Sequence, residues 1–400
     1  GGMARRIHGT LEGLDVQAYL DDLVGKVYKN PMIHVSHEAT IQSVEGYLGN
    51  FTTTVETEGR TKVIKHGASV LAIGADVYTP TEYLYGENDK VFTHIDLGGE
   101  IAAENDAVIN AESLVMIQCV GSRNETNNYC SRVCCGHAVK NAIKLKQENP
   151  DMRIYILFRD MRTYGFKEEA YREASELGVQ FIRYTSEDPP QVEAVKEGGK
   201  EVIRVTVNDP ILGYGLELDA DILSLAAAVI PSESTHEIAG HFKVTLSPDD
   251  FFKEAHVKLK PVEFATDGVF LCGTAHYPKH IPETINQAYG AAGRVITLLS
   301  NDTVVASGSV ARVNEFECVS CGACITACTY DAIQFYDTKK GKKAIVNPVL
   351  CKGDGLCNAK CPTNAIILKH FTNEALYGQI DAAVTREEIE EQLDALLEEV

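Results

Sequence analysis

The sequence has no uninterrupted apolar stretch approaching the roughly 20 residues of a membrane-spanning helix, so we expect no membrane span. Basic residues follow Gly1 closely, but no apolar segment comes behind them, and we expect neither a signal peptide nor a membrane anchor. Basic residues are also scarce overall: 37 Lys and Arg stand against 57 Asp and Glu, for a formal net charge of −20. Because contacts to phosphates need clustered Lys and Arg, this balance argues against nucleic acid as a partner. Since we expect neither a signal peptide nor a membrane anchor, we expect a cytoplasmic protein.

Without a secretory signal, the twelve cysteines do not indicate disulfides. Eleven of them fall into groups, and grouped cysteines in a cytosolic protein more often bind metal or carry out redox chemistry. The twelfth, Cys272, stands alone in an apolar segment and is interpreted as a small core residue.

The chain exceeds the roughly 250–300 residues at which a single core stops growing, so we expect several domains. From about residue 112 the pattern alternates between strand and helix, with strands at Leu114–Cys119 and Arg153–Phe158 and helices at His137–Gln147 and Lys167–Leu177. This alternation predicts an α/β fold. Two further apolar strands, at 68–74 and 268–274, lead into glycines.

Near the C-terminus, four cysteines have the spacing C-x2-C-x2-C-x3-C, which is typical of two-cluster bacterial ferredoxins: Cys318, Cys321, Cys324 and Cys328. In that arrangement three thiolates bind one [4Fe–4S] cluster and the fourth binds its neighbour. Structural zinc usually pairs two C-x2-C knuckles, so zinc is disfavoured here.

A second run, Cys351, Cys357 and Cys361, repeats the pattern, but Asp354 occupies the position of its second cysteine. Cross-ligation assigns the first cluster to Cys318, Cys321, Cys324 and Cys361, and the second to Cys351, Cys357 and Cys328 with a fourth corner in question. If Asp354 is a ligand, we expect the iron that it binds to be labile, because oxygen is a harder ligand than thiolate. The cluster would then convert to [3Fe–4S]. Asp354 as a turn residue is the alternative.

A third group lies upstream, between a strand and a helix, and consists of Cys119, Cys130, Cys134 and Cys135. Four thiols predict a cluster site, with zinc and buried structural cysteine as alternatives. Since adjacent cysteines do not face one metal from an ordinary helix, we expect Cys134 and Cys135 in a loop and the helix to begin near Gly136 or His137.

Three segments together with the ferredoxin-type module resemble the A-type subunit of heterodisulfide reductase over essentially the whole chain. The segments are Tyr129-Cys-Ser-Arg-Val-Cys-Cys, Phe158-Arg-Asp-Met-Arg-Thr-Tyr-Gly and Gly268-Val-Phe-Leu-Cys-Gly-Thr-Ala-His-Tyr-Pro. The resemblance implies a thioredoxin-reductase-like flavoprotein core with two dinucleotide-binding-type domains, one inserted in the other, plus an α+β domain with two [4Fe–4S] clusters. It also implies FAD, a third [4Fe–4S] cluster on the upstream cysteines, and flavin-based electron bifurcation.

The residues themselves support FAD only where a strand runs through glycine towards a helix N-terminus, whose N–H groups suit a flavin or pyrophosphate. The positions that match are Gly74, Gly273, Thr274, Pro282, Glu283 and Thr284. An ordinary strand-to-helix turn is the alternative. The resemblance implies further that Lys140 approaches the flavin ring and stabilises an anionic flavin, against the alternative of a solvated helix lysine.

A complete flavoprotein of this kind opens with G-x-G-x-x-G, and these 400 residues contain no such motif. We therefore expect a separate chain, or residues outside this sequence, to supply it and to hold the adenosine half of FAD. The predicted domains are 1–111 (FAD-domain portion), 112–235 (inserted, with the upstream cluster), 236–305 (return to the FAD domain), 306–370 (ferredoxin) and 371–400 (helical tail).

These features predict an oxidoreductase subunit of a soluble heterodisulfide-reductase-like complex, in which electron pairs at FAD are split into single electrons that travel through protein-bound clusters. The resemblance implies B- and C-type reductase subunits, a hydrogenase or formate dehydrogenase as donor, and ferredoxin as partners. Two alternatives remain: an iron–sulfur wiring subunit without flavin, and a subunit of a quinone-linked sulfur-metabolism complex. The sequence does not identify the electron donor or the acceptor.

Overall fold

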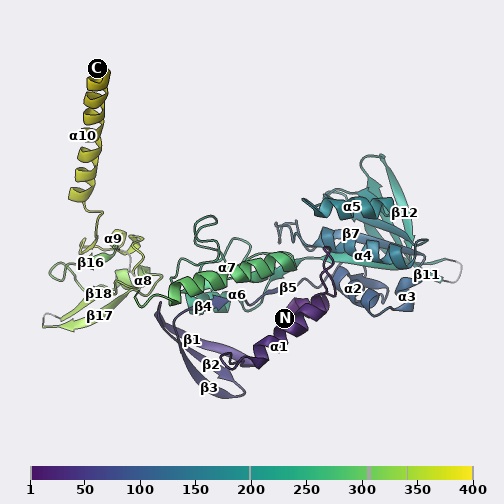
Figure 1. Ribbon diagram of the computed structural model, residues 1–400, viewed down its shortest axis with the longest axis horizontal. Helices are drawn as coiled ribbons and strands as arrows, with labels where there is room; N and C mark the ends of the chain where they lie inside the picture. The colour runs from purple at the N-terminus through teal and green to yellow at the C-terminus, as the bar shows by residue number, and fades with distance from the viewer. Residues whose placement is uncertain (1, 198–199, 304–307, 340, 399–400) are drawn as a thin grey trace. The chain divides into compact units, whose positions relative to one another are not determined.

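The computed structural model describes residues 2–197, 200–303, 308–339 and 341–398. By internal contacts the chain divides into two units, one formed by residues 1–44 and 52–296 and the other by residues 45–51 and 297–400 (Figure 1). The predicted division into five domains stays a prediction, and its boundary at 305/306 falls on residues outside those described.

The larger unit is built on a five-stranded parallel sheet in the order β6-β13-β7-β8-β9. The strands are β6 (Val91–Thr93), β13 (Ile222–Ala227), β7 (Ser113–Val120), β8 (Arg153–Phe158) and β9 (Gln180–Arg183). Their apolar runs suit parallel strands, which are buried on both faces. The predicted α/β alternation is therefore confirmed.

Helices cover one face of this sheet, and a second sheet covers the other. The helices are α2 (His94–Ala102), α3 (Asp106–Ile109), α4 (Cys134–Glu148) and α5 (Lys167–Glu176), and they share a core with Leu114 and Ile154 of the sheet. On the other face lies an antiparallel sheet of β10 (Gln191–Glu197), β11 (Lys200–Asp209) and β12 (Tyr214–Ala220). Both faces of the sheet are thus buried in apolar cores, and the loops at the carboxyl ends of its strands leave from buried strands.

Distant segments meet in two short pairings within the same unit. Strand β4 (Ser69–Leu71) pairs in parallel with β15 (Val269–Leu271), and β5 (Ala75–Val77) pairs with β14 (Val229–Pro231) in antiparallel fashion. After β15 come η2 (Gly273–Ala275) and the long helix α7 (Ile281–Leu299), while α6 (Thr235–Phe242) precedes β15. The apolar run from Ile222 to Ile230 thus forms two strands that belong to different sheets.

The N-terminal region holds η1 (Gly2–Arg6), α1 (Val16–Lys29) and a three-stranded sheet of β1 (Ala39–Tyr47), β2 (Asn50–Thr57) and β3 (Arg60–His66). Asp15 caps α1 by accepting a hydrogen bond from the Ala18 amide. A hairpin around Gly49 joins β1 to β2.

The smaller unit contains two antiparallel strand pairs and two short helices. Strand β16 (Ala311–Val313) pairs with β19 (Ile366–Leu368), and β17 (Ile333–Thr338) pairs with β18 (Gly341–Val346). The helices α8 (Ala323–Ala327) and α9 (Leu356–Ala359) follow the cysteine-rich turns, and α10 (Asn373–Glu398) ends the chain. None of the described helices combines the length and apolarity needed to cross a membrane.

Candidate iron–sulfur and cofactor sites

The two cysteine runs of the smaller unit are related by an offset of 33 residues, and equivalent residues in them make equivalent hydrogen bonds. The Ala332 amide donates to Cys328 Sγ at 3.4 Å, and the Ala365 amide donates to Cys361 Sγ at 3.2 Å. The two halves also bond to each other reciprocally, since Asn314 N donates to Ala365 O and Asn347 N donates to Ala332 O, both at 2.7 Å. This reciprocity is the pseudo-twofold symmetry that the repeat in the sequence predicts.

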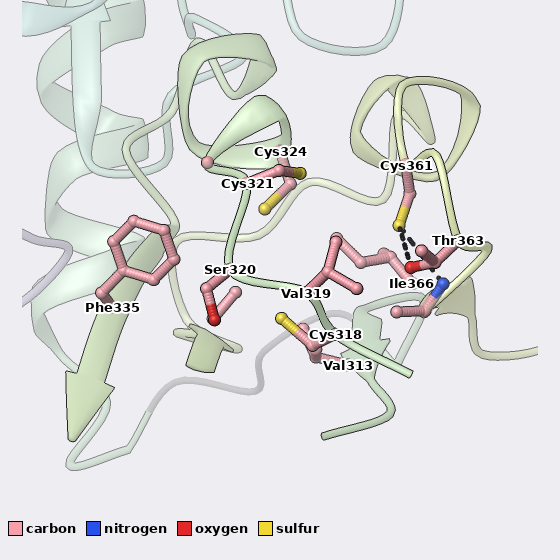
Figure 2. A pocket seen from close by; sticks show the side chains of 13 residues that line it. Val313, Cys318, Val319, Ser320, Cys321, Cys324, Phe335, Cys361, Thr363 and Ile366 are labelled. Atoms are coloured by element: carbon pink, nitrogen blue, oxygen red, sulfur yellow. Dashed lines mark hydrogen bonds between the residues drawn. The ribbon is translucent and has the colours of Figure 1, made fainter. Parts of the chain in front are cut away.

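The first cluster site is a pocket whose lining includes Cys318, Cys321, Cys324 and Cys361. Figure 2 shows the four sulfur atoms around one open space, with three of them from the first run and Cys361 from the second. Burial raises the pKa of Cys324. At Cys361 burial acts in the same direction, but hydrogen bonds from Thr363, Ala365 and Ile366 outweigh it and lower the pKa. Four thiols around one cavity are a donor set that fits a [4Fe–4S] cluster.

The second site gathers Cys328, Cys351 and Cys357 with Asp354. The pKa of Cys357 is raised to about 11, first by burial and then by the charges of Cys351, Asp354 and Cys328, so these groups lie close together. Asp354 stands at the position equivalent to Cys321, one residue before Gly355, as Cys321 is before Gly322. Its Oδ1 accepts a hydrogen bond from the Leu356 amide at 3.2 Å. Asp354 therefore closes a turn, and its charge also acts on Cys357 in the second site.

The upstream cysteines meet at the carboxyl end of the parallel sheet. Cys119 lies near the end of β7, Cys130 lies in the following loop, and Cys134 and Cys135 begin α4. The other three thiols all act on Cys134 electrostatically, which shows that the four are neighbours. Ligands bind at this end of the strands in open α/β sheets.

The expected loop at Cys134 and Cys135 is wrong, because α4 begins at Cys134 rather than near Gly136 or His137. A loop would be needed only if both thiols bound one metal ion. In a four-iron cluster each thiolate binds its own iron, so two neighbouring residues of a first helical turn need not point the same way. Among the described residues, no three His, Cys, Asp or Glu side chains converge as ligands of a single ion.

Burial and a left-handed backbone are features of the upstream site that agree with its predicted role as a cluster site. Burial raises the pKa of Cys134 well above its usual value and that of Cys135 to about 11, so their thiolates need a neighbouring positive charge, which iron would supply. Cys119 has a left-handed backbone with φ of 64°. Such a conformation costs of order 1–3 kcal/mol and persists mainly where function requires it. The assignment of all three ligand sets stays a prediction that this geometry supports.

Cys272 is buried against Val262 and Ala291, away from the other cysteines in sequence, and burial raises the pKa of its thiol. It occupies the position of a core residue, as expected.

The residues predicted to contact FAD come from the ends of β4 and β15 and from the start of α7. Gly74 and Gly273 both have left-handed backbones, with φ of 83° and 78°. A Cβ on Gly74 would lie 4.0 Å from Thr274 Oγ1, and one on Gly273 would lie 3.6 Å from Thr284 Cγ2. Four of the six predicted residues thus surround one spot, where glycine allows close approach of a ligand.

The other two predicted residues are less available. Pro282 lies in the first turn of α7, and Glu283 accepts hydrogen bonds from the His280 amide and from Arg132, each at 2.8 Å. The Gly273 amide donates to Gln287 Oε1 at 3.0 Å, so it is not directed at a cofactor. Gln287 also donates to His276, which bonds to Glu254 at 2.9 Å. No motif in the sequence indicated this Gln287–His276–Glu254 network, since its members lie far apart along the chain.

Lys140 is partly buried on α4 rather than fully solvated. Its Nζ donates a hydrogen bond to Gly9 O at 3.3 Å, and burial lowers the pKa of its ammonium group from 10.5 to about 8. Gly9 precedes α1, so the lysine connects the N-terminal region to the helix that carries Cys134 and Cys135, two of the predicted cluster ligands. A lysine near the switch between its charged and neutral forms suits a site next to a redox cofactor.

Because burial lowers the pKa of Lys140, we expect the free energy of unfolding to rise with pH. Between pH 8 and about 10.5 the unfolded chain keeps the proton that folded Lys140 loses, so stability increases across this window, by up to about 3 kcal/mol. The variant Lys140→Met should not show this rise in stability. Its midpoint of thermal unfolding should be higher than that of the wild type at pH 7, and this difference should disappear by pH 10. Lys144→Met changes an exposed lysine of the same helix and serves as control. Parallel curves for wild type and Lys140→Met would contradict the depressed pKa.

Comparisons with known proteins found a matching family model and several relatives. A model described as a 4Fe-4S dicluster domain matches residues 317–365. Together with the parallel sheet, this match confirms the predicted class, an α/β core with an α+β two-cluster ferredoxin domain. Among solved structures, thioredoxin reductase of T. acidophilum is similar with a TM-score of 0.49 and 12% identity, over 75% of this chain and 88% of that chain.

Two relatives illustrate the sequence similarity. The second A-type iron–sulfur subunit of the CoB–CoM heterodisulfide reductase of Methanopyrus kandleri is 37% identical over 335 residues, which cover 79% of this chain and 50% of the relative. The A-type subunit of the H(2)/formate:CoB-CoM heterodisulfide,ferredoxin reductase of Methanococcus maripaludis is 35% identical over 340 residues, with 80% and 50% covered. The chain therefore spans about half the length of the curated relatives that it matches.

Proposed function

Because this chain belongs to the family of A-type heterodisulfide reductase subunits over the region it shares with those relatives, we propose that it is an iron–sulfur flavoprotein subunit that converts two-electron into one-electron transfer. The observation that carries this proposal is the adjacency of the upstream cysteines to the glycine site at the start of α7. FAD would exchange electrons in pairs, and the clusters would carry them singly.

Two contacts support a direct path between these sites. The backbone amide of Arg132 donates a hydrogen bond to Cys130 Sγ at 3.3 Å. The guanidinium group of the same residue donates to Glu283 at 2.8 Å and to Pro278 O at 3.2 Å. On the neighbouring turn, a Cβ on Gly136 would lie 3.3 Å from His280 Cε1. One arginine thus connects a proposed iron ligand to the first turn of α7.

Each side chain has a role in this proposal that follows from its surroundings. The thiols of Cys119, Cys130, Cys134 and Cys135 hold the upstream cluster. The amides that donate to Cys328 and Cys361 stabilise negative charge on the ferredoxin-type clusters and so affect their potentials. Gly74 and Gly273 leave space for close approach of the flavin, and the ammonium group of Lys140 favours a negative charge beside α4.

The partners in this proposal follow from the relatives' names, which include H2 or formate, CoB–CoM heterodisulfide and ferredoxin. We infer a complex with B- and C-type reductase subunits, a hydrogenase or formate dehydrogenase as electron donor, and electron bifurcation towards disulfide and ferredoxin. The glycine-rich loop for the FAD pyrophosphate would come from polypeptide outside these 400 residues.

Gly273→Ala should weaken FAD binding about tenfold. A side chain at φ of 78° costs roughly 1–2 kcal/mol, and relaxing it moves the backbone that the flavin approaches. FAD retention is measured by the flavin absorbance band after anaerobic purification with added FAD, in the presence of co-purifying subunits. Gly240→Ala, on an open face of α6, is the control and should bind normally.

If the wild-type complex keeps a full set of clusters but never retains flavin, the flavin assignment is wrong and the chain is an iron–sulfur wiring subunit. If Gly273→Ala binds FAD as tightly as wild type, the flavin lies elsewhere.

A further inference from the structure

Four arginines gather around the upstream cysteines, and the proposed function gives them no role. Arg123 lies in the loop after β7, Arg159 and Arg162 lie in the loop after β8, and Arg183 ends β9. Because these parallel strands are neighbours, their carboxyl ends bring the four residues to one edge of the sheet. We call this group the arginine collar.

Arg123 is the member in direct contact with a proposed ligand. Its Nη1 lies 3.9 Å from Cys119 Sγ, and only 18% of its side chain is exposed. The charges of Arg123 and Arg159 both stabilise the Cys119 thiolate, although burial outweighs them and raises its pKa. At Cys135 the Arg162 amide donates to the sulfur.

The collar is held together by its own hydrogen bonds. Arg159 Nη1 donates to Arg123 O at 2.9 Å, and Arg183 Nε donates to Arg159 O at 3.0 Å. Asp160 accepts from Arg123 at 2.6 Å through one carboxylate oxygen and from Arg183 at 3.1 Å through the other. The four cations of the collar have two carboxylates near them, Asp160 and Glu187, and this leaves a positive environment in a chain whose net charge is −20.

We propose that the arginine collar, through Arg123, raises the reduction potential of the cluster held by Cys119, Cys130, Cys134 and Cys135. This inference rests on the proposed function, which places a cluster there. When the cluster accepts one electron, its negative charge increases and no bond breaks. A fixed positive charge close to the sulfurs favours that reduced form, and a hydrogen bond to Cys119 acts in the same direction. Arg123 is thus a positioning and tuning residue rather than a ligand.

The sign of the effect distinguishes electrostatics from a structural role. Arg123→Gln removes a cation, whereas Asp160→Asn removes a carboxylate that opposes the collar and keeps its shape. The first variant should make reduction harder and the second should make it easier. A merely disruptive substitution gives no reason for opposite shifts.

The test is an anaerobic redox titration of the full chain with dithionite, followed by electron paramagnetic resonance. At the wild-type midpoint potential, the ratio of reduced to oxidised upstream cluster should fall about tenfold in Arg123→Gln, a shift of about 59 mV. In Asp160→Asn the ratio should rise. Arg123→Lys keeps the charge and should retain most of the wild-type potential, and Arg172→Gln, on the exposed surface of α5, should change nothing.

Unchanged potentials in Arg123→Gln and Asp160→Asn, with iron content equal to wild type, overturn the inference and leave the proposed function intact. Shifts in the same direction overturn it as well. If wild type contains iron for only two clusters, the upstream cluster of the proposed function is absent, and the inference falls with it.

Discussion

Replacing Cys134 and Cys135 by serine is expected to reduce the iron content of the anaerobic protein from about twelve to about eight atoms per chain, which corresponds to the loss of one [4Fe–4S] cluster. The two residues occupy the first turn of α4 and supply half of the proposed upstream ligands. Two remaining thiols do not hold a four-iron cluster. The ferredoxin-type sites lie in the other unit and keep their own ligands.

Iron, acid-labile sulfide and zinc are measured together, because zinc on the same thiols would leave the iron count near eight in wild type and variant alike. Cys272→Ser is the matched control, since it changes a buried cysteine of the same unit that is not a proposed ligand. Equal iron in wild type and in the double variant would contradict an upstream cluster. Loss of iron in Cys272→Ser would show that the assay reports on folding.

The parallel sheet could be predicted from the sequence because its signals are local. The apolar runs at Leu114–Cys119 and Arg153–Phe158 are short, buried and separated by amphipathic helices, and β7 and β8 match them closely. The repeat around Asp354 was equally visible, since a 33-residue offset aligns the cysteines and the glycines that follow them without knowledge of the fold.

The candidate cofactor site was less predictable because its contacts are long-range. Strands β4 and β15 pair across 200 residues, and this pairing brings Gly74 to Thr274. The bond from the Gly273 amide to Gln287 depends on where α7 packs, and no residue pattern signals it. Likewise Arg132 reaches Glu283 across 151 positions. Sequence spacing identified the ligand types, and only the fold showed which of them are neighbours.

The start of α4 differs from the predicted one for a chemical reason. Two adjacent cysteines that bind one ion favour a loop. The fold instead uses them at a helix N-terminus, where unpaired amides and the helix dipole stabilise negative charge. That environment suits a cluster whose charge becomes more negative on reduction, so the misplaced boundary is itself informative about the site.

Asp354→Cys is expected to suppress oxidative conversion of the second ferredoxin-type cluster to a three-iron form. With aspartate at this corner, oxygen replaces sulfur as ligand to one iron, and mild oxidation should release that iron while the other clusters stay intact. The aspartate lies beside Cys357 and takes the place of Cys321 in the repeat, so a thiolate there completes the C-x2-C-x2-C-x3-C pattern. The potential of this cluster should shift as well, because ligand type influences it.

The reciprocal variant Cys321→Asp makes this test specific, because it places an aspartate at the equivalent position of the first cluster. After exposure to ferricyanide, wild type should give one three-iron signal in electron paramagnetic resonance, Asp354→Cys none, and Cys321→Asp signals from both clusters. A different pattern is expected if Asp354 only closes its turn by accepting from the Leu356 amide. Wild type and Asp354→Cys would then oxidise alike and share one cluster potential, and the fourth ligand would be water or another side chain.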